Sequence, residues 1–403
     1  MITALTAFLA ISTKGDPIGS QFMELPCQFL PNSVGHVFTT IVQTEDGRSH
    51  LFLVDTGSAE SWISPHAVSA FNEQSSETKL ALRLQSPTSS DSETVTFRAS
   101  VDTYGVDSAL KQTLRGISVE GTLGLNAFQH AQVLLDYAQD RVWLRIGHPT
   151  KLTRQGVAGL MGTSVGVFSV DQPLRADSIL AVPLTETRSG SYTVKANIGG
   201  KIAQLTVDTG SEILALHKRK YSVSAIQAIG KSGGLTSKGD YQAICGVSPT
   251  TTIGKWSLPW PNIYQDEDDE DDDGVISPAE FGSDTVLLDL RAHVLYVKAG
   301  TDNDWGEAAL FQFTGLKCRI IDGQVWMAGD GGEAAFASFK NEQILSIRGI
   351  PSQQVLIDLK DQLKGNRSAR NRLFKLLISQ WPTAEITVLD HDKPQGIRFP
   401  RHA

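Results

Sequence analysis

The feature that most constrains this chain is a short unit that occurs twice, a strand-like run leading directly into Asp-Thr-Gly-Ser. In the first copy residues 51–54 precede Asp55, and in the second copy residues 204–207 precede Asp208. An apolar run bounded by Gly and Ser predicts a buried strand that ends in a tight turn. Each copy is therefore predicted to deliver one carboxylate to the end of a strand.

The similarity between the two halves extends beyond the tetrapeptide. Asp208 stands 153 positions after Asp55, and the same offset aligns three further segments without a net gap. Residues 121–128 align with 274–281, residues 133–136 with 286–289, and residues 142–144 with 295–297. Upstream, Leu25-Pro26 resembles Val182-Pro183 at a slightly larger offset. Self-similarity at a fixed spacing marks a repeated structural unit, so a duplicated lobe is predicted.

Two such motifs, each followed by an apolar strand and then by a Leu-Asp strand, resemble a two-lobed aspartic protease of the pepsin type. The compact lobes are more similar to the retropepsin-like aspartyl proteases of bacteria than to the longer pepsins. The resemblance covers roughly residues 22–298 and departs from the family pattern at Ser277, where the family usually has Gly. It implies a mostly β fold with two pseudo-symmetric lobes.

The resemblance also implies that Asp55 and Asp208 are a catalytic pair that needs no metal and no cofactor. Hydrolysis of a peptide bond requires an activated water and an acid for the carbonyl oxygen, and two carboxyl groups sharing one proton supply both. Carboxylates about 3 Å apart cannot both ionise, so one pKa rises and the other falls.

The rest of the two turns receives supporting roles. These residues are Thr56, Gly57, Ser58, Thr209, Gly210 and Ser211. The threonines resemble the family's paired threonines, which lock the two turns together, and the glycines allow close backbone approach. Each serine hydroxyl is expected to donate to a carboxylate oxygen, which favours the charged form and lowers its pKa. An acidic pH optimum follows.

The family covers its substrate with an exposed hairpin, the flap, and each lobe offers candidates. In the first lobe these are the Ser-rich loop at residues 85–93 and the segment 102–106, where Tyr104 is the candidate flap residue because pepsin-like flaps carry a tyrosine. In the second lobe the candidate is residues 230–246. Ordinary surface loops are the alternative.

An acidic run at residues 266–273 raises a second possibility. Asp269, Asp271, Asp273, Gly274 and Glu280 fit the calcium-loop pattern D-x-D-x-D-G-x₅-E. An EF-hand needs a helix on each side, but prolines lie just upstream, and the repeat assigns residues 274–281 to the second lobe. We expect no metal, with a calcium loop as the alternative to a solvated acidic loop.

The repeat ends by residue 298, and the following residues have a different pattern. Residues 325–328, 331–335 and 343–349 resemble a PDZ domain of the bacterial type, and residues 314–318 stand where that family has its carboxylate-binding loop. The edge strand of a PDZ domain pairs with an extended peptide and captures its C-terminal carboxylate. A small α+β domain of another kind is the alternative.

These observations divide the chain into five segments. They are a leader or disordered tail (1–21), a first protease lobe (22–150), an inter-lobe linker (151–175), a second protease lobe (176–300) and a PDZ-like domain (310–403). The net charge of −8 disfavours a nucleic-acid partner, and no apolar run reaches membrane-spanning length. The three distant cysteines provide neither a metal spacing nor a disulfide framework.

The predicted function is an aspartic endopeptidase acting on peptides or proteins. The alternative is a non-catalytic peptide-binding protein that uses the groove and the PDZ-like domain, but both motifs are whole, which favours the enzyme. Because both aspartates lie in one chain, we expect a monomer. The short apolar segment 2–11 suggests a secretory signal and hence a periplasmic or secreted location, although no Lys or Arg precedes it.

Overall fold

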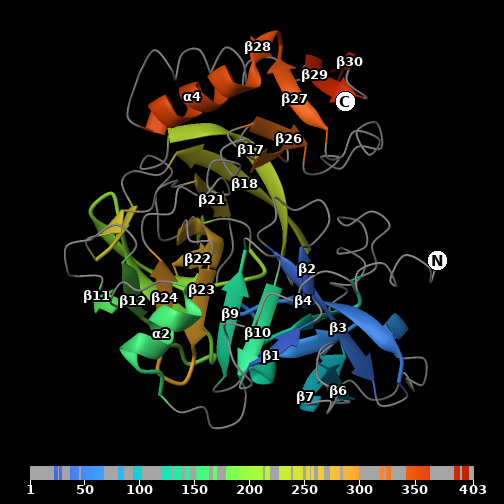
Figure 1. Cartoon of the computed structure of the whole chain (residues 1–403), viewed down its shortest axis with the longest axis vertical. Helices are drawn as coiled ribbons and strands as arrows, with labels where there is room; N and C mark the ends of the chain where they lie inside the picture. Colours follow the sequence, from blue (N-terminus) through green and yellow to red (C-terminus); the bar gives the residue numbers. More distant parts are fainter. Residues whose placement is uncertain are drawn as a thin grey trace.

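The computed structural model is mostly β in the part of the chain that it describes, as the sequence predicts. The described residues are 22–25, 27–29, 37–44, 47–67, 80–85, 94–101, 119–128, 131–137, 141–145, 151–162, 167–169, 178–211, 214–217, 227–236, 239–247, 251–254, 256–257, 262–266, 273–281, 285–298, 318–321, 324–327, 342–363, 385–390 and 393–398. Within them the α-helices are α2 (Arg154–Leu160) and α4 (Ser352–Leu363), and neither is long and apolar enough to cross a membrane. Figure 1 shows the lobes at one end of the molecule and α4 at the other.

The first lobe is a seven-stranded sheet that closes on itself. Its order is β2 (Cys27–Phe29), β3 (Phe38–Thr44), β4 (Ser49–Val54), β8 (Gly121–Leu123), β5 (Ser61–Ile63), β7 (Thr94–Val101) and β6 (Leu80–Gln85), with β6 also pairing with β3. Along β4 the residues His50, Phe52 and Val54 are buried, and those between them are more exposed. Side chains of a strand alternate between its two faces, so this pattern fixes which face meets the core.

The second lobe is built on a larger, ten-stranded sheet. Its main order is β17 (Gln227–Thr236), β18 (Gly239–Val247), β21 (Asn262–Asp266), β16 (Leu214–His217), β22 (Gly274–Ile276), β15 (Lys201–Val207), β14 (Tyr192–Ile198), β19 (Thr251–Ile253) and β20 (Trp256–Ser257). The short strand β13 (Thr185–Glu186) pairs with β14.

The strand register repeats between the lobes at the offset found in the sequence. The parallel pair β4–β8 matches Phe52 with Gly121, and the parallel pair β15–β22 matches Leu205 with Gly274, each 153 positions later. Likewise β5 and β8 run antiparallel, as do β16 and β22, with every partner displaced by the same 153 positions. The duplicated sequence therefore forms a duplicated arrangement of strands around each aspartate.

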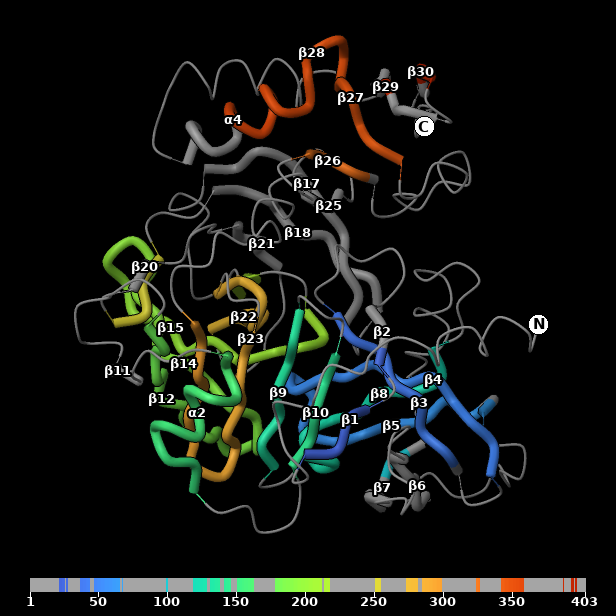
Figure 2. The backbone as a smooth tube through the Cα atoms, in the orientation of Figure 1, coloured from blue at the N-terminus to red at the C-terminus, as the bar shows by residue number. Residues whose placement is uncertain are grey.

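A third sheet joins the two lobes (Figure 2). Its order is β1 (Met23–Leu25), β10 (Arg141–Arg145), β9 (Gln132–Asp136), β23 (Thr285–Asp289), β24 (Val294–Lys298), β12 (Ile179–Pro183) and β11 (Val167–Ser169). At its centre Leu134 lies opposite Leu287, its own counterpart in the repeat. Leu25 pairs with Val142 as Val182 pairs with Leu295, so the upstream similarity reflects equivalent strands.

Helix α2 lies within the segment interpreted from the sequence as a linker. The Thr153 hydroxyl caps it by accepting from the Gly156 N–H at 3.0 Å, and Val157 packs with Leu134 in a cluster at the inter-lobe sheet. Glycine in a helix costs about 1 kcal/mol relative to alanine. Because of Gly156 and Gly159, the sequence therefore does not predict this helix. Burial of its apolar side chains outweighs that intrinsic cost.

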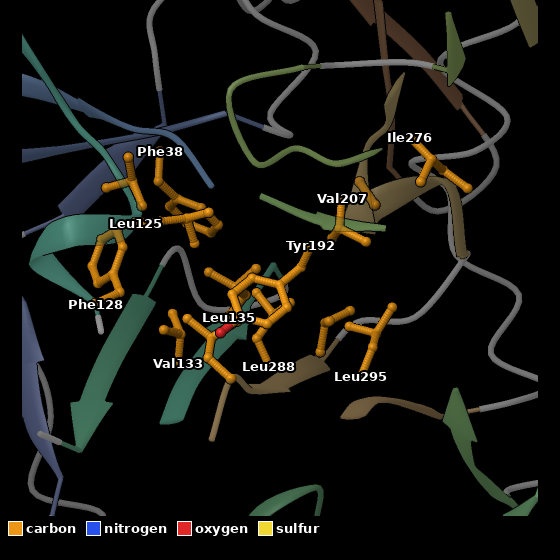
Figure 3. Close-up of a cluster of buried hydrophobic side chains, with 14 of the residues drawn as sticks. Phe38, Leu125, Phe128, Val133, Leu135, Tyr192, Val207, Ile276, Leu288 and Leu295 are labelled. Carbon is orange, nitrogen blue, oxygen red and sulfur yellow. The ribbon is translucent and has the colours of Figure 1, made fainter. Parts of the chain in front are cut away.

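One continuous hydrophobic core connects both lobes through the joining sheet (Figure 3). Figure 3 shows Phe38 and Phe128 from the first lobe, Leu135 and Leu288 from the joining sheet, and Ile276 from the second lobe. Full burial of such a side chain contributes roughly 1.5–3 kcal/mol. The shared core holds the ends of β4 and β15 in a common frame.

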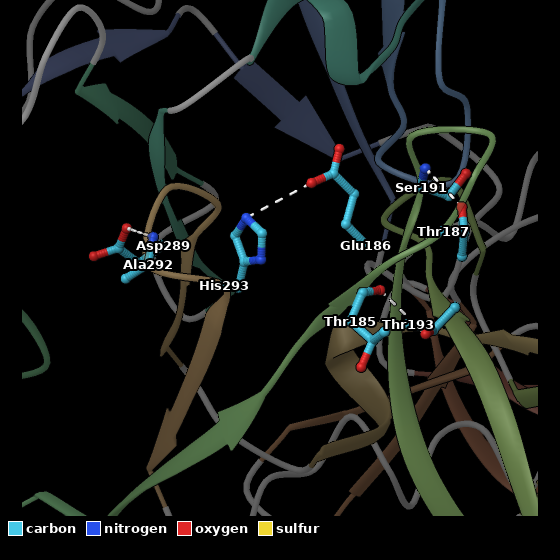
Figure 4. Close-up of polar contacts among 8 residues, drawn as sticks. All are labelled: Thr185, Glu186, Thr187, Ser191, Thr193, Asp289, Ala292 and His293. Atoms are coloured by element: carbon cyan, nitrogen blue, oxygen red, sulfur yellow. Dashed lines mark hydrogen bonds and ion pairs between the residues drawn. The ribbon is translucent and has the colours of Figure 1, made fainter.

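Polar contacts fasten the turn between β23 and β24 (Figure 4). One carboxylate oxygen of Asp289 accepts from the Ala292 N–H at 3.0 Å, and the other accepts from the Gln132 amide at 2.9 Å. His293, at a positive φ of 52°, lies 3.7 Å from the Glu186 carboxylate on β13. The Asp289–Gln132 contact joins β23 to β9 within the joining sheet, and the His293–Glu186 contact ties the joining sheet to β13 of the second lobe.

The C-terminal region forms a separate antiparallel sheet packed against α4. Its strands are β25 (Cys318–Ile321), β26 (Gln324–Met327), β27 (Gln343–Ile347), β28 (Ile350–Pro351), β29 (Glu385–Asp390) and β30 (Lys393–Arg398). Arg348 and Gly349 both have positive φ and make the tight turn between β27 and β28. The Ser352 hydroxyl donates to the Ile344 carbonyl at 2.6 Å, fixing the start of α4.

Candidate active site

The two aspartates stand at equivalent positions, each directly after a central strand of its lobe. The Asp55 N–H donates to the Leu123 carbonyl, and the Asp208 N–H donates to the Ile276 carbonyl, both at 3.0 Å. Each aspartate is therefore anchored to the end of the parallel neighbour, β8 or β22. Each residue keeps part of its surface exposed, so solvent reaches the pair, although protein atoms pack closely around both carboxyl groups.

The two threonines of the motifs form a reciprocal lock between the turns. The Thr56 hydroxyl accepts from the Thr209 N–H at 3.1 Å and donates to the Val207 carbonyl at 2.8 Å. The Thr209 hydroxyl accepts from the Thr56 N–H at 3.0 Å and donates to the Val54 carbonyl at 2.8 Å. Both threonines are buried, so each bond is protected from water. The four bonds hold the two aspartate-bearing turns against one another.

The motif glycines are required because each turn lies against the opposite carboxyl group. A Cβ added at Gly57 would lie 2.6 Å from Cγ of Asp208, and one added at Gly210 would lie 2.9 Å from Cγ of Asp55. Real Cβ atoms essentially never come closer than 3.0 Å to such an atom, so both added groups would displace the facing carboxyl. The missing side chain therefore makes room for the facing carboxyl groups.

The two carboxyl groups have unequal hydrogen bonding. Oδ1 of Asp55 accepts from the Gly57 N–H at 2.9 Å and from the Ser58 N–H at 3.1 Å. Oδ1 of Asp208 accepts from the Gly210 N–H at 2.7 Å, whereas the Ser211 N–H is directed at the Asp208 backbone carbonyl at 3.4 Å. The two carboxyls also share a hydrogen bond with each other.

Burial governs the protonation of both groups. Burial raises the pKa of Asp208 well above its usual range, and the nearby charge of Asp55 raises it further. Burial also raises the pKa of Asp55, but hydrogen bonds from Asp208, Ser58 and Gly57 oppose that rise. The two carboxyl groups therefore share one proton, and the observable titration belongs to the pair.

The predicted role of the Ser58 hydroxyl is wrong. That hydroxyl donates to the Glu60 carbonyl at 2.7 Å and accepts from the Trp62 indole N–H at 3.0 Å. A hydroxyl has one proton to donate, so none remains for the Asp55 carboxylate. The backbone N–H of Ser58 contacts that carboxylate instead. For Ser211 the hydroxyl contact stays a prediction.

Polar residues beside the first turn form a network that the sequence reading missed. Oδ1 of Asn126 accepts from both the N–H and the hydroxyl of Ser61, at 2.8 and 2.6 Å, and the Ser61 hydroxyl accepts from the Gly124 N–H at 2.9 Å. Next to this network, the Trp62 indole N–H donates to the Ser58 hydroxyl. The sequence signal for this network is Ser61, a polar residue on a short strand that the repeat pattern predicts to be buried.

The departure at Ser277 leaves the anchoring of Asp208 intact. Ser277 is buried, and its hydroxyl accepts from the Ala279 N–H at 3.3 Å. In the first lobe a Cβ at the equivalent Gly124 would lie only 2.3 Å from the Glu60 carbonyl oxygen. The packing of the first lobe therefore requires glycine at position 124, whereas the second lobe accommodates the side chain of Ser277.

Of the flap candidates, Tyr104 and the loop at residues 86–93 lie outside the described residues. The second-lobe candidate, residues 230–246, lies in the antiparallel hairpin formed by β17 and β18, where Gly234 pairs with Tyr241. A hairpin was expected at this place. Its contact with a substrate stays a prediction.

The calcium-loop alternative does not fit the described part of the acidic segment. Residues that would line the loop form strand β22, paired with β15 and β16. A carboxylate oxygen of Asp273 accepts from the Gln204 N–H at 2.7 Å, and Glu280 is buried in the 3₁₀ helix η5 (Pro278–Phe281). Among the described residues no group of three or more His, Cys, Asp or Glu side chains could hold a metal.

Comparisons with known proteins identify no family. No protein-family model matches the chain, and no curated protein matches it significantly. Among solved structures it is similar to basic 7S globulin from soybean, at 9% identity, and to conglutin gamma, a basic 7S globulin from lupine seeds, at 11% identity. Both matches have a TM-score of 0.37 and cover 69% of this chain and 95% of the other. Scores this low carry no argument about this chain, so the site is described from its own geometry.

Proposed function

We propose that the protein is an aspartic endopeptidase whose catalytic pair is Asp55 and Asp208. The observation that carries the proposal is the reciprocal arrangement of the two turns, in which each threonine hydroxyl bonds the other turn and each glycine lies against the other carboxyl. Such an arrangement holds two carboxyl groups close enough to share a proton. It does so within one chain, so we infer that a monomer carries the whole site.

The reaction follows from the unequal protonation of the pair. The Asp55 carboxylate accepts a proton from a water molecule as the water oxygen attacks the peptide carbonyl carbon, while Asp208 gives its proton to the carbonyl oxygen. The tetrahedral intermediate then breaks its C–N bond. Asp55 gives the proton that it took from water to the departing nitrogen, and Asp208 takes back the proton from a hydroxyl of the intermediate as the C=O bond re-forms. The products are a carboxylic acid and an amine, and the pair returns to its starting protonation. The backbone N–H groups on Asp55 stabilise its charged form before the attack.

The direct test replaces one carboxyl at a time by its amide. Asp55→Asn and Asp208→Asn are each expected to reduce kcat/KM for a denatured protein substrate by roughly 10²–10⁴-fold, because each removes one partner of the proton exchange. Activity per chain should stay constant on dilution, and a pepstatin-type inhibitor should block the unmodified protein. Unfolding curves in urea serve as the control for folding. Full activity in either variant excludes the pair.

The C-terminal region supports a second, finer proposal. We infer a PDZ-like peptide-binding domain from the strand–turn–helix segment at residues 343–363 and from the packing of α4 on β26, β27 and β28. If this region alone carries function, the protein is a non-catalytic peptide binder, and both Asp→Asn variants would bind peptides unchanged.

We also propose a periplasmic or secreted location, which is tested by fractionating cells that express the full chain.

A further inference from the structure

Glu280 is a buried carboxylic acid that the proposed mechanism does not use. Its side chain is 3% exposed, and in the part of the chain that the structure describes neither carboxyl oxygen has a hydrogen-bond partner. Burial raises the pKa of Glu280 well above its usual value of 4.5, and burial is the one cause of this shift. An unpaired carboxylate is strongly disfavoured in such a place, so the folded second lobe holds Glu280 in its neutral form.

The position of Glu280 connects it to the anchor of Asp208. Its backbone N–H donates to the Ser277 carbonyl at 3.0 Å, within the turn that directly follows β22. The last residue of β22, Ile276, accepts the Asp208 N–H. A disturbance of η5 therefore acts on the segment that fixes one half of the candidate site.

The first lobe has no such group at the matching place. The repeat offset aligns Glu280 with Ala127, a buried residue of the equivalent 3₁₀ helix η3 (Leu125–Ala127). The two helices occupy the same place in their lobes, yet one holds a methyl group and the other holds an ionisable acid. The asymmetry confines any pH response of this position to the second lobe.

No neighbouring ionisable group accounts for the raised pKa of Glu280. Helix η3 contacts β5 and β7 in the first lobe, and the strands of the second lobe that correspond to them in the repeat are β16 and β21. His217 lies on β16, and Asp208 and Asp273 flank β15 and β22. None of these contributes to the pKa of Glu280. Strand β21 carries Tyr264 and Asp266, whose side chains are outside the described part of the chain.

We propose that Glu280 makes the second lobe the pH-labile half of the molecule, because its ionisation at rising pH opens η5 and releases the anchor of Asp208. The sign follows from linkage. A carboxyl that binds its proton more tightly when folded stabilises the fold fully below pH 4.5, and that stabilisation is lost as the pH rises towards the folded pKa. One such group changes the unfolding equilibrium constant by up to tenfold per pH unit.

The first experiment measures urea unfolding of the full chain between pH 4 and pH 8. The unfolding constant of the unmodified protein should rise more steeply with pH than that of Glu280→Gln or Glu280→Met, by up to tenfold per unit. Asp208 contributes equally to all three proteins, so the difference isolates Glu280. The Met variant keeps an apolar side chain of similar length should the buried amide of the Gln variant prevent folding. Equal slopes in all proteins that fold would overturn the proposal.

The second experiment locates the opening by hydrogen exchange, with rates corrected for intrinsic pH dependence. Peptides covering residues 205–211 and 274–281 should lose protection as the pH rises, while residues 52–58 and 121–128 keep it. Glu280→Gln should abolish this difference, and the matched variant Ala127→Glu should bring the same lability to the first lobe. Equal loss in both lobes of the unmodified protein contradicts the proposal. Neither experiment uses catalysis, so both remain decisive if the protease proposal fails.

Discussion

The turn at Asp55 and the turn at Asp208 share a backbone frame but are fastened by different chemistry. In the first lobe the buried Ser61 and the partly buried Asn126 form a polar network beside the turn. The matching positions in the second lobe are Leu214 and Ala279, both buried and apolar. The contacts that face the pair, the threonine lock and the glycines, are reciprocal. Positions that touch the opposite turn have kept their chemistry, whereas positions behind them have diverged.

The same comparison extends to the carboxyl groups. Asp55 accepts backbone N–H bonds from Gly57 and Ser58, and Asp208 accepts one from Gly210, while the Gly57 N–H also lowers the pKa of Asp208. Both carboxyl groups are therefore supported by backbone donors. The one proton that they share supplies the charged base and the neutral acid that the proposed reaction requires.

Apart from the aspartates themselves, the largest effect is expected from adding a methyl group to the motif glycines. Gly57→Ala should lower kcat/KM by roughly 10²-fold or more, because its Cβ would lie 2.6 Å from Asp208 Cγ and must displace that carboxyl. Gly210→Ala should do less, since its nearest contact is 2.9 Å. Steady-state kinetics on one peptide substrate compares the two. An equal loss would show that the turns are more alike than the contacts indicate.

The duplicated arrangement of strands was predictable from the sequence, but the side-chain hydrogen bonds that support each turn were not. The fixed offset, the strands ending in Asp55 and Asp208 and the mostly β architecture all follow from local pattern and self-similarity. The Ser61–Asn126 network joins residues 65 positions apart, and no local periodicity reports such a contact. The hydroxyl of Ser58 was misassigned because its competing partner, the Glu60 carbonyl, depends on the conformation of the turn.

The second effect concerns the threonine lock, where the lobes should behave alike. Thr56→Val and Thr209→Val each keep the side-chain shape but leave a backbone N–H and a carbonyl without partners, which should cost about 2–4 kcal/mol of unfolding free energy. Urea unfolding measures both. The double variant should cost less than the sum, since the two hydroxyls support one interface. A large difference between the single variants would contradict the reciprocity.

A smaller effect, confined to the first lobe, is expected at Asn126. Asn126→Ala removes an acceptor for two buried donors of Ser61 and should cost about 1–3 kcal/mol of unfolding free energy. The double variant Ser61→Leu with Asn126→Ala copies the second lobe, but it also deprives the Gly124 N–H of the Ser61 hydroxyl. It therefore leaves as many unsatisfied groups as Asn126→Ala and should not recover that loss. A clear recovery would show that the first lobe tolerates the apolar arrangement of the second.

The smallest effect is expected at Ser58, where the structure removes the pKa shift that the sequence predicts from its hydroxyl. Activity requires the proton on Asp208, so it should fall as the pH rises through the raised pKa of the pair. The Ser58 hydroxyl bonds the Glu60 carbonyl rather than the carboxylate, and the backbone N–H that does bond Asp55 survives substitution. Ser58→Ala should therefore leave the alkaline limb of the pH–rate profile in place. Trp62→Phe, which removes the indole donor to the same hydroxyl, is the matched control and should behave alike. An upward shift of that limb in Ser58→Ala alone would mean that the hydroxyl turns to the carboxylate in the working enzyme.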